Sequence, residues 1–411
     1  MKQNAIVKIA GQKVRENDAR TRAMRAEGLP RLNNQSTLTG VVERQRVEIP
    51  RGALGYFPQQ AIIVPQVPLV IEQGSNALAL SITTLGQPLT QLIQIREGVR
   101  AAQADARAAQ ADLDRARNEI AFHVHEVYYG LLIADRQARA AESRIAASEA
   151  RLRDARTAVE AGNVLEVQTI GARAALLESR HALLQVSDQR AELEMQLNDL
   201  MGLALGTPLE LEPPPPVAPA GAALEVLQQD ALRANPEIRA AEQTVEKARH
   251  GLAAARADAI PGISVFAQHL YQNGVPFLSR NNGVFGLRME WNVFDSGKRR
   301  SVTAERQAQL AQAEENLRRL RGRHAIEVEK AWRKRERARR MVEVAEEGLA
   351  LRKEMYRLAA DQLEAGVSSG SAHAEAAAAL DKSAADALAA ELALRLAQAE
   401  LDLAVGVSAA P

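Results

Sequence analysis

The 411-residue sequence contains no cysteine, few aromatic residues and no long apolar run. The absence of cysteine excludes disulfide bonds, zinc sites built on thiolates and catalysis by a cysteine nucleophile. Aromatic residues make up only 3% of the chain, which is little for the core of a large globular domain. No segment reaches the roughly 18 uninterrupted apolar residues that mark a transmembrane helix. Residues 1–20 hold no apolar run of signal-peptide length either.

An excess of charge of one sign is also missing. The chain has 52 Lys and Arg against 51 Asp and Glu, a net charge of +1, so the total charge favours neither nucleic acid nor anionic lipid as a partner. What the sequence has in abundance is Ala, Leu, Glu, Arg and Gln. That mixture is typical of long helices and coiled coils when it comes with helical periodicity.

Two similar segments, VEAGNV and LEAGVS, indicate an internal repeat. Their glycines, Gly162 and Gly366, are 204 residues apart (366 − 162). Gly202 and Gly406 have the same spacing (406 − 202). We therefore interpret the chain as two copies of one unit.

The repeat is interrupted by an insertion and joined by a proline-rich connector. Pro30 and Pro261 lie in similar segments but are 231 residues apart (261 − 30), so the first half carries 27 extra residues (231 − 204). Four consecutive prolines in LEPPPPVAPAG cannot be helical and form a stiff connector. We expect the first repeat over 1–210, the connector over 211–221 and the second repeat over 222–411.

Each repeat is expected to contain the same elements in the same order. The first should hold a partial helix (1–28), a strand hairpin (30–89), a long helix (90–160) and a return helix (164–203). The second should hold a helix (223–258), a strand hairpin (261–294), a long helix (296–364) and a return helix (368–406). The helix over 223–258 is long enough to stack end to end on a return helix.

The clearest strand signal is VFGLRMEWNVF (284–294), in which apolar and polar residues alternate. This period of two predicts a strand with one apolar and one polar face. The apolar face holds Phe285, Leu287, Met289, Trp291 and Val293. The expected partner strand is 262–271. In the first half, 76–85 is expected to pair with a strand in 37–49.

Four strands per chain are too few to close a membrane barrel, because the smallest such barrels have about eight. In the first half, Leu78, Leu80 and Ile82 share one face of the predicted strand. Amphipathic strands with open edges need partners. We therefore expect several chains to share one barrel, with an apolar face toward lipid and a polar face toward a lumen.

The long helices show coiled-coil spacing. From Leu92 to Ile120, apolar or small residues recur with alternating steps of three and four. A helix of about 70 residues is about 105 Å long, more than a globular domain accommodates. Such a helix has to turn back, and we expect Gly162 and Gly366 to end the two long helices in the left-handed conformation.

This order of proline, strand hairpin, long helix, tip glycine and shorter helix, present twice, resembles the TolC-type outer-membrane efflux protein family. The segments that carry the resemblance are 234–265, 290–317, GQPL at 86–89 and the two EAG tips. It covers nearly the whole chain. It implies a mainly α protein with β strands: a homotrimer whose strands form a 12-stranded transmembrane barrel and whose long helical hairpins form a periplasmic α-barrel.

The resemblance also implies a function and partners. It implies a passive exit duct in a tripartite efflux or type I secretion system, in the outer membrane and across the periplasm. The partners would be outer-membrane lipid, a periplasmic adaptor protein and, through it, an inner-membrane pump, with no nucleic acid. Drugs, metal ions and polypeptides all remain open as cargo. Residues 1–28 resemble only the last part of the family's first helix, so we expect the complete protein to begin earlier, with a signal peptide.

A gate at the periplasmic end is a further implication. In the family, acidic residues often lie six and nine positions after the second tip glycine, where this chain has Ala372 and Glu375. Three copies of Glu375 would form a carboxylate ring that attracts cations. His373 between them would add pH sensitivity. The alternative is that both Glu375 and His373 are ordinary exposed helix residues.

The tips are the expected contact sites for the adaptor, because exposed loops on rigid scaffolds often bind partners. The tip residues are Glu160, Ala161, Gly162, Asn163 and Val164, and Glu364, Ala365, Gly366, Val367 and Ser368. The alternative is a turn with a structural role alone. GVSSGSAHAEAAAAL after the second tip departs from the family, which usually has large apolar residues there.

Other motifs favour ordinary explanations. His123 and His125 point about 200° apart on a helix and cannot share a metal ion. The basic run 317–340 contains interspersed glutamates and one aromatic residue, which favours a solvated helix face over nucleic-acid binding. FDSGK (294–298) lacks phosphate-loop spacing and is expected to be a turn. No nucleophile–base pair is present, and we expect no enzymatic activity, metal or cofactor.

The main alternative function is a soluble coiled-coil scaffold. Helices rich in Ala, Glu and Arg and the lack of a signal sequence favour it. The alternating segment 284–294 argues against it, because a scaffold has no use for an amphipathic strand.

Overall fold

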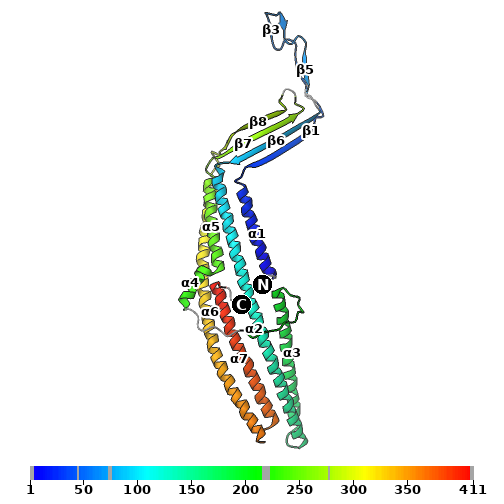
Figure 1. Ribbon diagram of the computed structural model, residues 1–411, viewed down its shortest axis with the longest axis vertical. Coiled ribbons are helices and arrows are strands. Elements are labelled where there is room, and N and C mark those ends of the chain that lie inside the picture. The colour runs from blue at the N-terminus through cyan, green and yellow to red at the C-terminus, as the bar shows by residue number, and fades with distance from the viewer. Residues whose placement is uncertain (1–3, 44–45, 73–75, 215–222, 276–277, 408–411) are drawn as a thin grey trace. The chain divides into compact units, whose positions relative to one another are not determined.

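The computed structural model describes residues 4–43, 46–72, 76–214, 223–275 and 278–407 (Figure 1). Helices dominate it, and most of the other regular structure is antiparallel sheet. The chain divides into two units, each described below by itself. The helical unit comprises Met1–Asn17, Ala104–Val245 and Gln312–Pro411, and the sheet unit comprises Asp18–Gln103 and Glu246–Ala311. Each unit therefore combines parts of both repeats.

The helices follow the predicted order. They are α1 (Ala5–Ala26), α2 (Gln91–Glu160), α3 (Val167–Met201), α4 (Leu224–Ala234), α5 (Pro236–Ala257), α6 (Lys298–Glu364) and α7 (Gly370–Val405). The two long helices, α2 and α6, have 70 and 67 residues. These and the return helices α3 and α7 begin and end within a few residues of the predicted positions.

The prediction of a single helix over 223–258 is wrong, because the chain breaks between α4 and α5. Asn235 has an extended backbone with φ −60° and ψ 122°. Its side-chain oxygen accepts hydrogen bonds from the N–H groups of Glu237 and Ile238, at 2.9 and 3.4 Å, and so caps α5. Pro236 disfavours a helical residue before it and is well tolerated as the first residue of a helix. The Asn-Pro pair explains the break.

The main sheet has four antiparallel strands in the order β1-β6-β7-β8. They are β1 (Arg31–Gly40), β6 (Ala77–Pro88), β7 (Gly262–Asn273) and β8 (Asn281–Glu290). The pairing of β6 with β7 joins the two repeats, and β1 and β8 are the edges. Two short hairpins occupy the insertion of the first repeat: β2 (Arg46–Ile49) with β5 (Leu69–Glu72), and β3 (Tyr56–Phe57) with β4 (Ile62–Ile63).

The predicted partner of β6 is right only in part. Residues 37–40 pair with β6, but β1 already begins at Arg31, where polar residues give no alternation. Residues 46–49, predicted to be in the same strand, instead form β2 and pair with β5. The pairing of β7 with β8 agrees with the prediction.

The strand β8 is shorter than the alternation suggests. It ends at Glu290, which pairs with Gly262 at the start of β7. The assignment of Trp291 and Val293 to the strand is therefore wrong, although both side chains are exposed. The residue that would continue the ladder on β7 is Pro261, which has no N–H group to donate.

The register decides which apolar residues share a face of the sheet. Phe285 on β8 is aligned through Ala267 with Leu85 on β6, so these three side chains lie on one face. Leu80 and Ile82 are an odd number of residues from Leu85 and lie on the opposite face. The apolar residues that the sequence predicts for the two repeats therefore do not form one continuous face.

The helical unit has several small hydrophobic clusters in place of one large core. On its long helix α2 the buried residues are largely alanines, including Ala104, Ala109, Ala111, Ala121, Ala134, Ala147 and Ala150. Small side chains at these positions let neighbouring helices approach closely. Within the described part of the chain, no helix combines the length and apolar character needed to cross a membrane.

Candidate functional site

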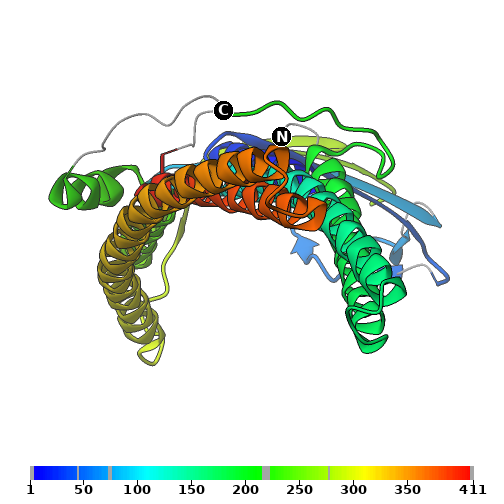
Figure 2. The ribbon, with the colours of Figure 1, turned by 90° about the horizontal axis from the view of Figure 1, so that it is seen from below.

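Four helices of the helical unit lie side by side in the order α6, α7, α2, α3 (Figure 2). The α2–α7 contact includes a hydrogen bond from the Ser143 hydroxyl to Asp381. The α2–α3 contact includes a bond of 3.0 Å between the Ser148 and Ser179 hydroxyls. An ion pair joins α6 to α7 on the other side. The two hairpins, α2–α3 and α6–α7, thus meet through α2 and α7.

The first tip ends α2 with a left-handed glycine, as predicted. Gly162 has φ 75°. Its N–H donates to the carbonyl of Val159, and the Asn163 N–H donates to the carbonyl of Ala158, both at 2.9 Å. These two bonds form a Schellman motif, which satisfies carbonyls at the end of a helix. All five predicted residues of this tip are exposed.

The second tip repeats this geometry. Gly366 has φ 71°, and its N–H donates to the carbonyl of Leu363 at 3.0 Å. The Val367 N–H donates to the carbonyl of Gln362 at 3.0 Å. Ser368 is half-buried, and the other four predicted residues of this tip are exposed.

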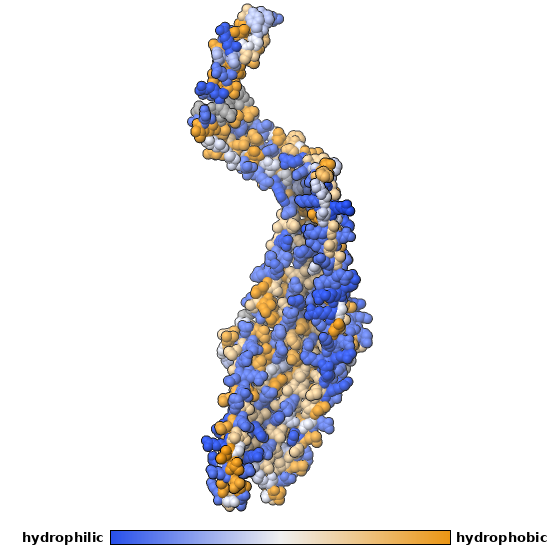
Figure 3. Space-filling model, turned by 180° about the vertical axis from the view of Figure 1, so that it is seen from behind, coloured by the Kyte–Doolittle hydropathy of each residue, from blue (hydrophilic) through white to orange (hydrophobic). Residues whose placement is uncertain are grey.

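The chain after each glycine gives the two tips different chemistry. The first tip continues into exposed apolar side chains, namely Val164, Leu165, Val167 and Ile170. Figure 3 shows apolar side chains at this end of the α2–α3 hairpin. The second tip has one exposed apolar residue, Val367, and then continues into serines. Ser369 caps α7 by accepting a hydrogen bond from the Ala372 N–H at 3.2 Å. The sequence prediction stopped at Val164 and missed the apolar residues that follow it.

The three gate candidates lie on the first turns of α7. Glu375 is not isolated, because its carboxylate lies 3.6 Å from the Arg151 guanidinium on α2. His373 is half-buried and faces Tyr356 on α6, with ring centroids 5.1 Å apart. Ala372 is exposed. In the single chain His373 is therefore neither solitary nor fully exposed, and no sequence pattern indicated Arg151 or Tyr356 as partners.

In both repeats an asparagine joins two helices end to end. The Asn4 amide donates to the carbonyl of Leu200 near the end of α3, at 3.2 Å, while its oxygen caps α1. The Asn235 amide donates to the carbonyl of Ala404 near the end of α7, at 3.1 Å, while its oxygen caps α5. Each return helix is thus continued by another helix of its own repeat.

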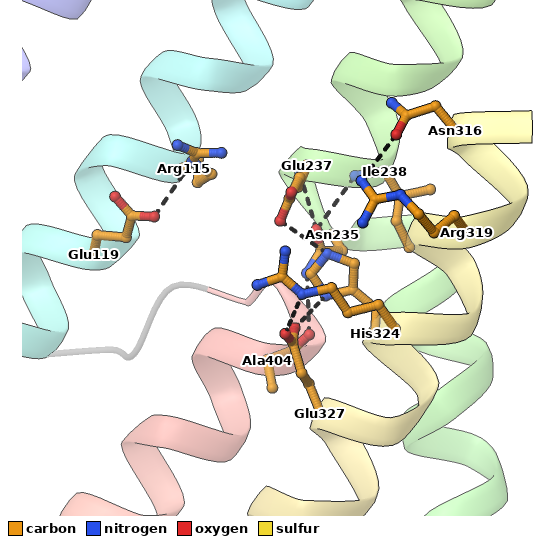
Figure 4. Close-up of polar contacts among 11 residues, drawn as sticks. Arg115, Glu119, Asn235, Glu237, Ile238, Asn316, Arg319, His324, Glu327 and Ala404 are labelled. Carbon is orange, nitrogen blue, oxygen red and sulfur yellow. Dashed lines mark hydrogen bonds and ion pairs between the residues drawn. The ribbon is translucent and has the colours of Figure 1, made fainter. Parts of the chain in front are cut away.

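The side chains around these two junctions differ. In the first repeat Ile120 packs in an apolar cluster with Val7. In the second repeat the equivalent residue is His324, which is 5% exposed (Figure 4). Its Nε2 atom lies 3.0 Å from Glu237 and its Nδ1 atom 3.1 Å from Glu327. A buried polar network replaces apolar packing at the same place in the fold.

The outer helices α3 and α6 expose apolar residues at heptad spacing. On α3 they are Ile170, Leu177 and Leu184. On α6 they are Met341, Val344, Leu351, Met355 and Leu358. Side chains spaced in this way form the contact seam of a coiled coil. The sequence analysis did not single them out.

The histidines of HVHE lie apart, as expected. His123 bonds to Glu126 at 3.1 Å, while the His125 ring faces Tyr129, with centroids 5.7 Å apart. Burial lowers the pKa of His125. Among the residues that the structure describes, no group of three or more His, Cys, Asp or Glu could hold a metal ion.

The basic run 317–340 is largely neutralised by neighbouring carboxylates. Its ion pairs include Arg318–Glu315, Arg321–Glu242, Arg323–Glu327, Arg333–Glu329 and Arg339–Glu343. Most of these pairs join residues three or four apart on α6, as on a solvated helix face. This geometry favours the interpretation as a solvated face over a nucleic-acid site.

Comparisons with known proteins agree with the fold. The family model for outer membrane efflux proteins matches residues 2–203 and 227–407. A search of curated proteins gives no match. Among solved structures, the outer-membrane channel OprN is 17% identical, with a TM-score of 0.76 over 98% of this chain and 87% of its own.

Two further channels are similar. The CmeC outer membrane channel of Campylobacter jejuni is 15% identical, with a TM-score of 0.77 over 98% of this chain and 83% of its own. The outer membrane protein VceC of Vibrio cholerae is 13% identical, with a TM-score of 0.75 over 99% of this chain and 94% of its own. Both share the fold of this chain.

Proposed function

Because this chain belongs to the outer membrane efflux protein family and is an outer-membrane efflux channel, we propose that it works as a passive exit duct built from three copies. Cargo would pass through the duct without chemical change, and we propose no catalytic role. In this proposal the duct receives small molecules, metal ions or polypeptides from an inner-membrane pump through a periplasmic adaptor.

The open sheet is the observation that carries the proposal. Among the residues that the structure describes, β1 and β8 each have one side without a partner strand, and such edges must be paired inside a membrane. Two copies would give eight strands, a barrel whose interior is filled by side chains. Three copies give twelve strands and leave room for a channel.

The heptad seams support the same assembly. The exposed apolar residues of α3 and α6 lie on the two outer helices of the four-helix layer (Figure 2). An α6 seam against the α3 seam of the next copy would bury both and continue the layer into a ring. We therefore assign α3 and α6 as the contact helices between copies.

The sheet face with Phe285, Leu287 and Met289 is the proposed lipid-facing surface. Their side chains are exposed in the single chain, with Phe285 at 89%. Trp291 and Val293 follow β8 outside the strand, and we propose that they lie at the membrane interface, where aromatic residues gather in barrels.

We propose that Glu375, His373 and Ala372 lie at the constriction of the duct. The Arg151–Glu375 ion pair and the hydrogen bond from Ser143 to Asp381 both join α2 to α7, so they would hold the two hairpins together. In this arrangement the Glu375 carboxylate is partly neutralised by Arg151. The constriction would open when these α2–α7 contacts separate.

The hairpin tips are the proposed adaptor contacts. The first tip offers several apolar residues, whereas the second offers Val367 and then serines. One adaptor segment that engages both tips would need an apolar part and a polar part. The difference between the two tips comes from the residues after each glycine, because the backbone turns at the two tips are alike.

The proposal is tested by the size of the protein in detergent. The chain, exported and extracted from outer membranes, should have a mass by light scattering of about three times 44.5 kDa after subtraction of detergent. Leu351→Glu with Leu358→Glu should abolish the trimer, since charges would lie in the seam. Ala350→Glu with Arg357→Gln is the matched control: it makes the same change of net charge at exposed positions of α6 outside the seam, and it should leave the mass unchanged. A monomer or dimer would refute the duct built from three copies.

A further inference from the structure

A basic cavity of about 490 Å³ lies in the sheet unit between the end of α5 and the start of α6. Its lining residues are Ala255, Arg256, Ala259, Arg299, Arg300, Thr303, Ala304 and Gln307. Three of these eight are arginines and none is acidic. Neither the efflux function nor the comparisons assign it a role.

The three arginines are not equivalent. Arg299 is held in place, because its guanidinium bonds to Asp295 at 2.8 Å and also donates to the carbonyl of Asn292. Arg256 and Arg300 are exposed and form no ion pair with any residue in the described part of the chain. The cavity therefore holds two uncompensated positive charges beside a fixed third one.

The same place in the first repeat is closed. The residue equivalent to Ala259 is Gly28, and the residue equivalent to Arg299 is Ile95. A Cβ atom placed on Gly28 would lie 3.6 Å from the Ile95 side chain and 3.2 Å from that of Leu92. In the first repeat, apolar side chains thus occupy the position that is open and basic in the second repeat. The first repeat also has arginines at the positions equivalent to Arg256 and Arg300, namely Arg25 and Arg96. The two repeats therefore carry similar charge here, and the main difference is the open space in the second.

The cavity also adjoins an apolar segment. Between β8 and α6 the chain exposes Trp291, Val293 and Phe294. The Arg299 bond to the Asn292 carbonyl ties this segment directly to the cavity. Exposed aromatic and aliphatic side chains next to arginines form the kind of surface found where lipid tails meet headgroups.

We infer that the α5–α6 cavity binds the phosphate headgroup of an anionic phospholipid. Guanidinium groups suit phosphate because they present several donors in a planar fork. The cavity lies a few residues beyond the ends of β7 and β8. If the sheet spans the membrane, as the proposed function requires, this is the level of the periplasm-facing headgroups. The inference rests on that function.

The test uses the detergent-solubilised channel in native mass spectrometry with added lipid. The wild-type protein should bind phosphatidylglycerol about tenfold more tightly than phosphatidylethanolamine with the same acyl chains. Arg256→Gln with Arg300→Gln should weaken phosphatidylglycerol binding by about tenfold, as expected for the loss of a charge-assisted hydrogen bond. Phosphatidylethanolamine binding should not change. The matched control is Arg25→Gln with Arg96→Gln, at the equivalent positions of the closed first repeat, and it should bind like wild type.

Three results would overturn the inference. One is equal binding of the two lipids by wild type, and another is an equal loss in both double variants, which would indicate general charge attraction. The third is inorganic phosphate that binds as tightly as the lipid and displaces it, which would make free phosphate the ligand. The same spectra give the mass of the assembly. A trimer without lipid preference would refute only the headgroup site, whereas a chain that forms no trimer would refute the proposed duct.

Discussion

The two junctions in the middle of the helical unit have the same backbone arrangement but different side chains. In both, an asparagine caps one helix and holds the end of another. The first repeat surrounds its junction with Ile120 and Leu131, which are buried and apolar. At the equivalent positions the second repeat has His324 and Arg335, which are also buried.

The comparison distinguishes the residues that set the positions of the helix ends from the side chains that pack around them. The shared elements are the capping asparagines and the left-handed glycines Gly202 and Gly406, with φ 74° and 91°. The surrounding residues changed from apolar to charged while the helix ends kept their places. A buried ion pair and an apolar cluster of similar volume often stabilise a fold to similar extents.

Gly406→Ala should cause the largest loss, about 3 kcal/mol or more in the free energy of unfolding. A Cβ atom there would lie 2.4 Å from the Cα atom of Asn235, and the backbone is left-handed. Gly366→Ala is the control: its φ is also positive, but its Cβ would meet nothing within 4 Å, so about 1–2 kcal/mol is expected. The measurement is urea unfolding of the purified channel with Trp291 replaced by Phe, followed by the fluorescence of Trp332, which packs at the junction. Equal losses at the two sites would refute the close helix contact.

His324→Ile should cost about 1–3 kcal/mol, because it leaves Glu237 and Glu327 side by side without the ring that bonds to both. Adding Glu237→Ile removes one of the two carboxylates, introduces the residue found at the equivalent position of the first repeat, Ile6, and should recover most of the loss. The same unfolding assay on both single variants and the double variant completes a double-mutant cycle. Strictly additive losses would show that the network does not act as a unit.

Asn235→Ala should cost about 1–2 kcal/mol, and Asn4→Ala about the same, since each asparagine caps one helix and bonds to a second. The effect of each substitution on its own junction is measured by the hydrogen-exchange rates of the capped N–H groups of Ile6 and Glu237. Faster exchange at the mutated junction alone is expected. Faster exchange at both junctions would mean that the repeats unfold together.

Asp402→Asn should have the smallest effect and should show as a change in pH dependence. Burial raises the pKa of Asp402, partly offset by a hydrogen bond from Gln398 and by the charge of Arg335. A carboxyl with a raised pKa contributes stability below its ordinary value of 3.8 and loses it as pH rises through the raised value. The variant carries the residue of the first repeat, Asn198, and should lack this decline. Unfolding midpoints that fall with pH equally in both proteins would contradict the prediction.

Local patterns predicted much of the fold. Heptad spacing located α2, the internal repeat located α6, and the tip glycines marked where both helices end. The spacing and the glycines are signals from residues close together in the chain. Period-two alternation found β8 but not its end. The end of β8 depends on Pro261, which is distant in sequence and cannot donate to the ladder.

The candidate site was predicted less completely. The sequence placed Glu375 and His373 on the return helix but gave no indication of Arg151 or Tyr356, their partners on α2 and α6. The exposed seam residues on α3 and α6 look like ordinary core positions in the sequence. They stand out only when the structure leaves them uncovered.

The two-fold repeat, the long helices, the tip turns and the number of main strands could be predicted without the structure. Each of these follows from backbone preferences or from a periodic pattern within one segment. Three features became visible only in the folded chain: the strand register, the face on which Leu80 lies, and the asparagine junctions between helix ends. These features depend on which distant segments meet, and one residue of register moves a side chain to the other face of a sheet.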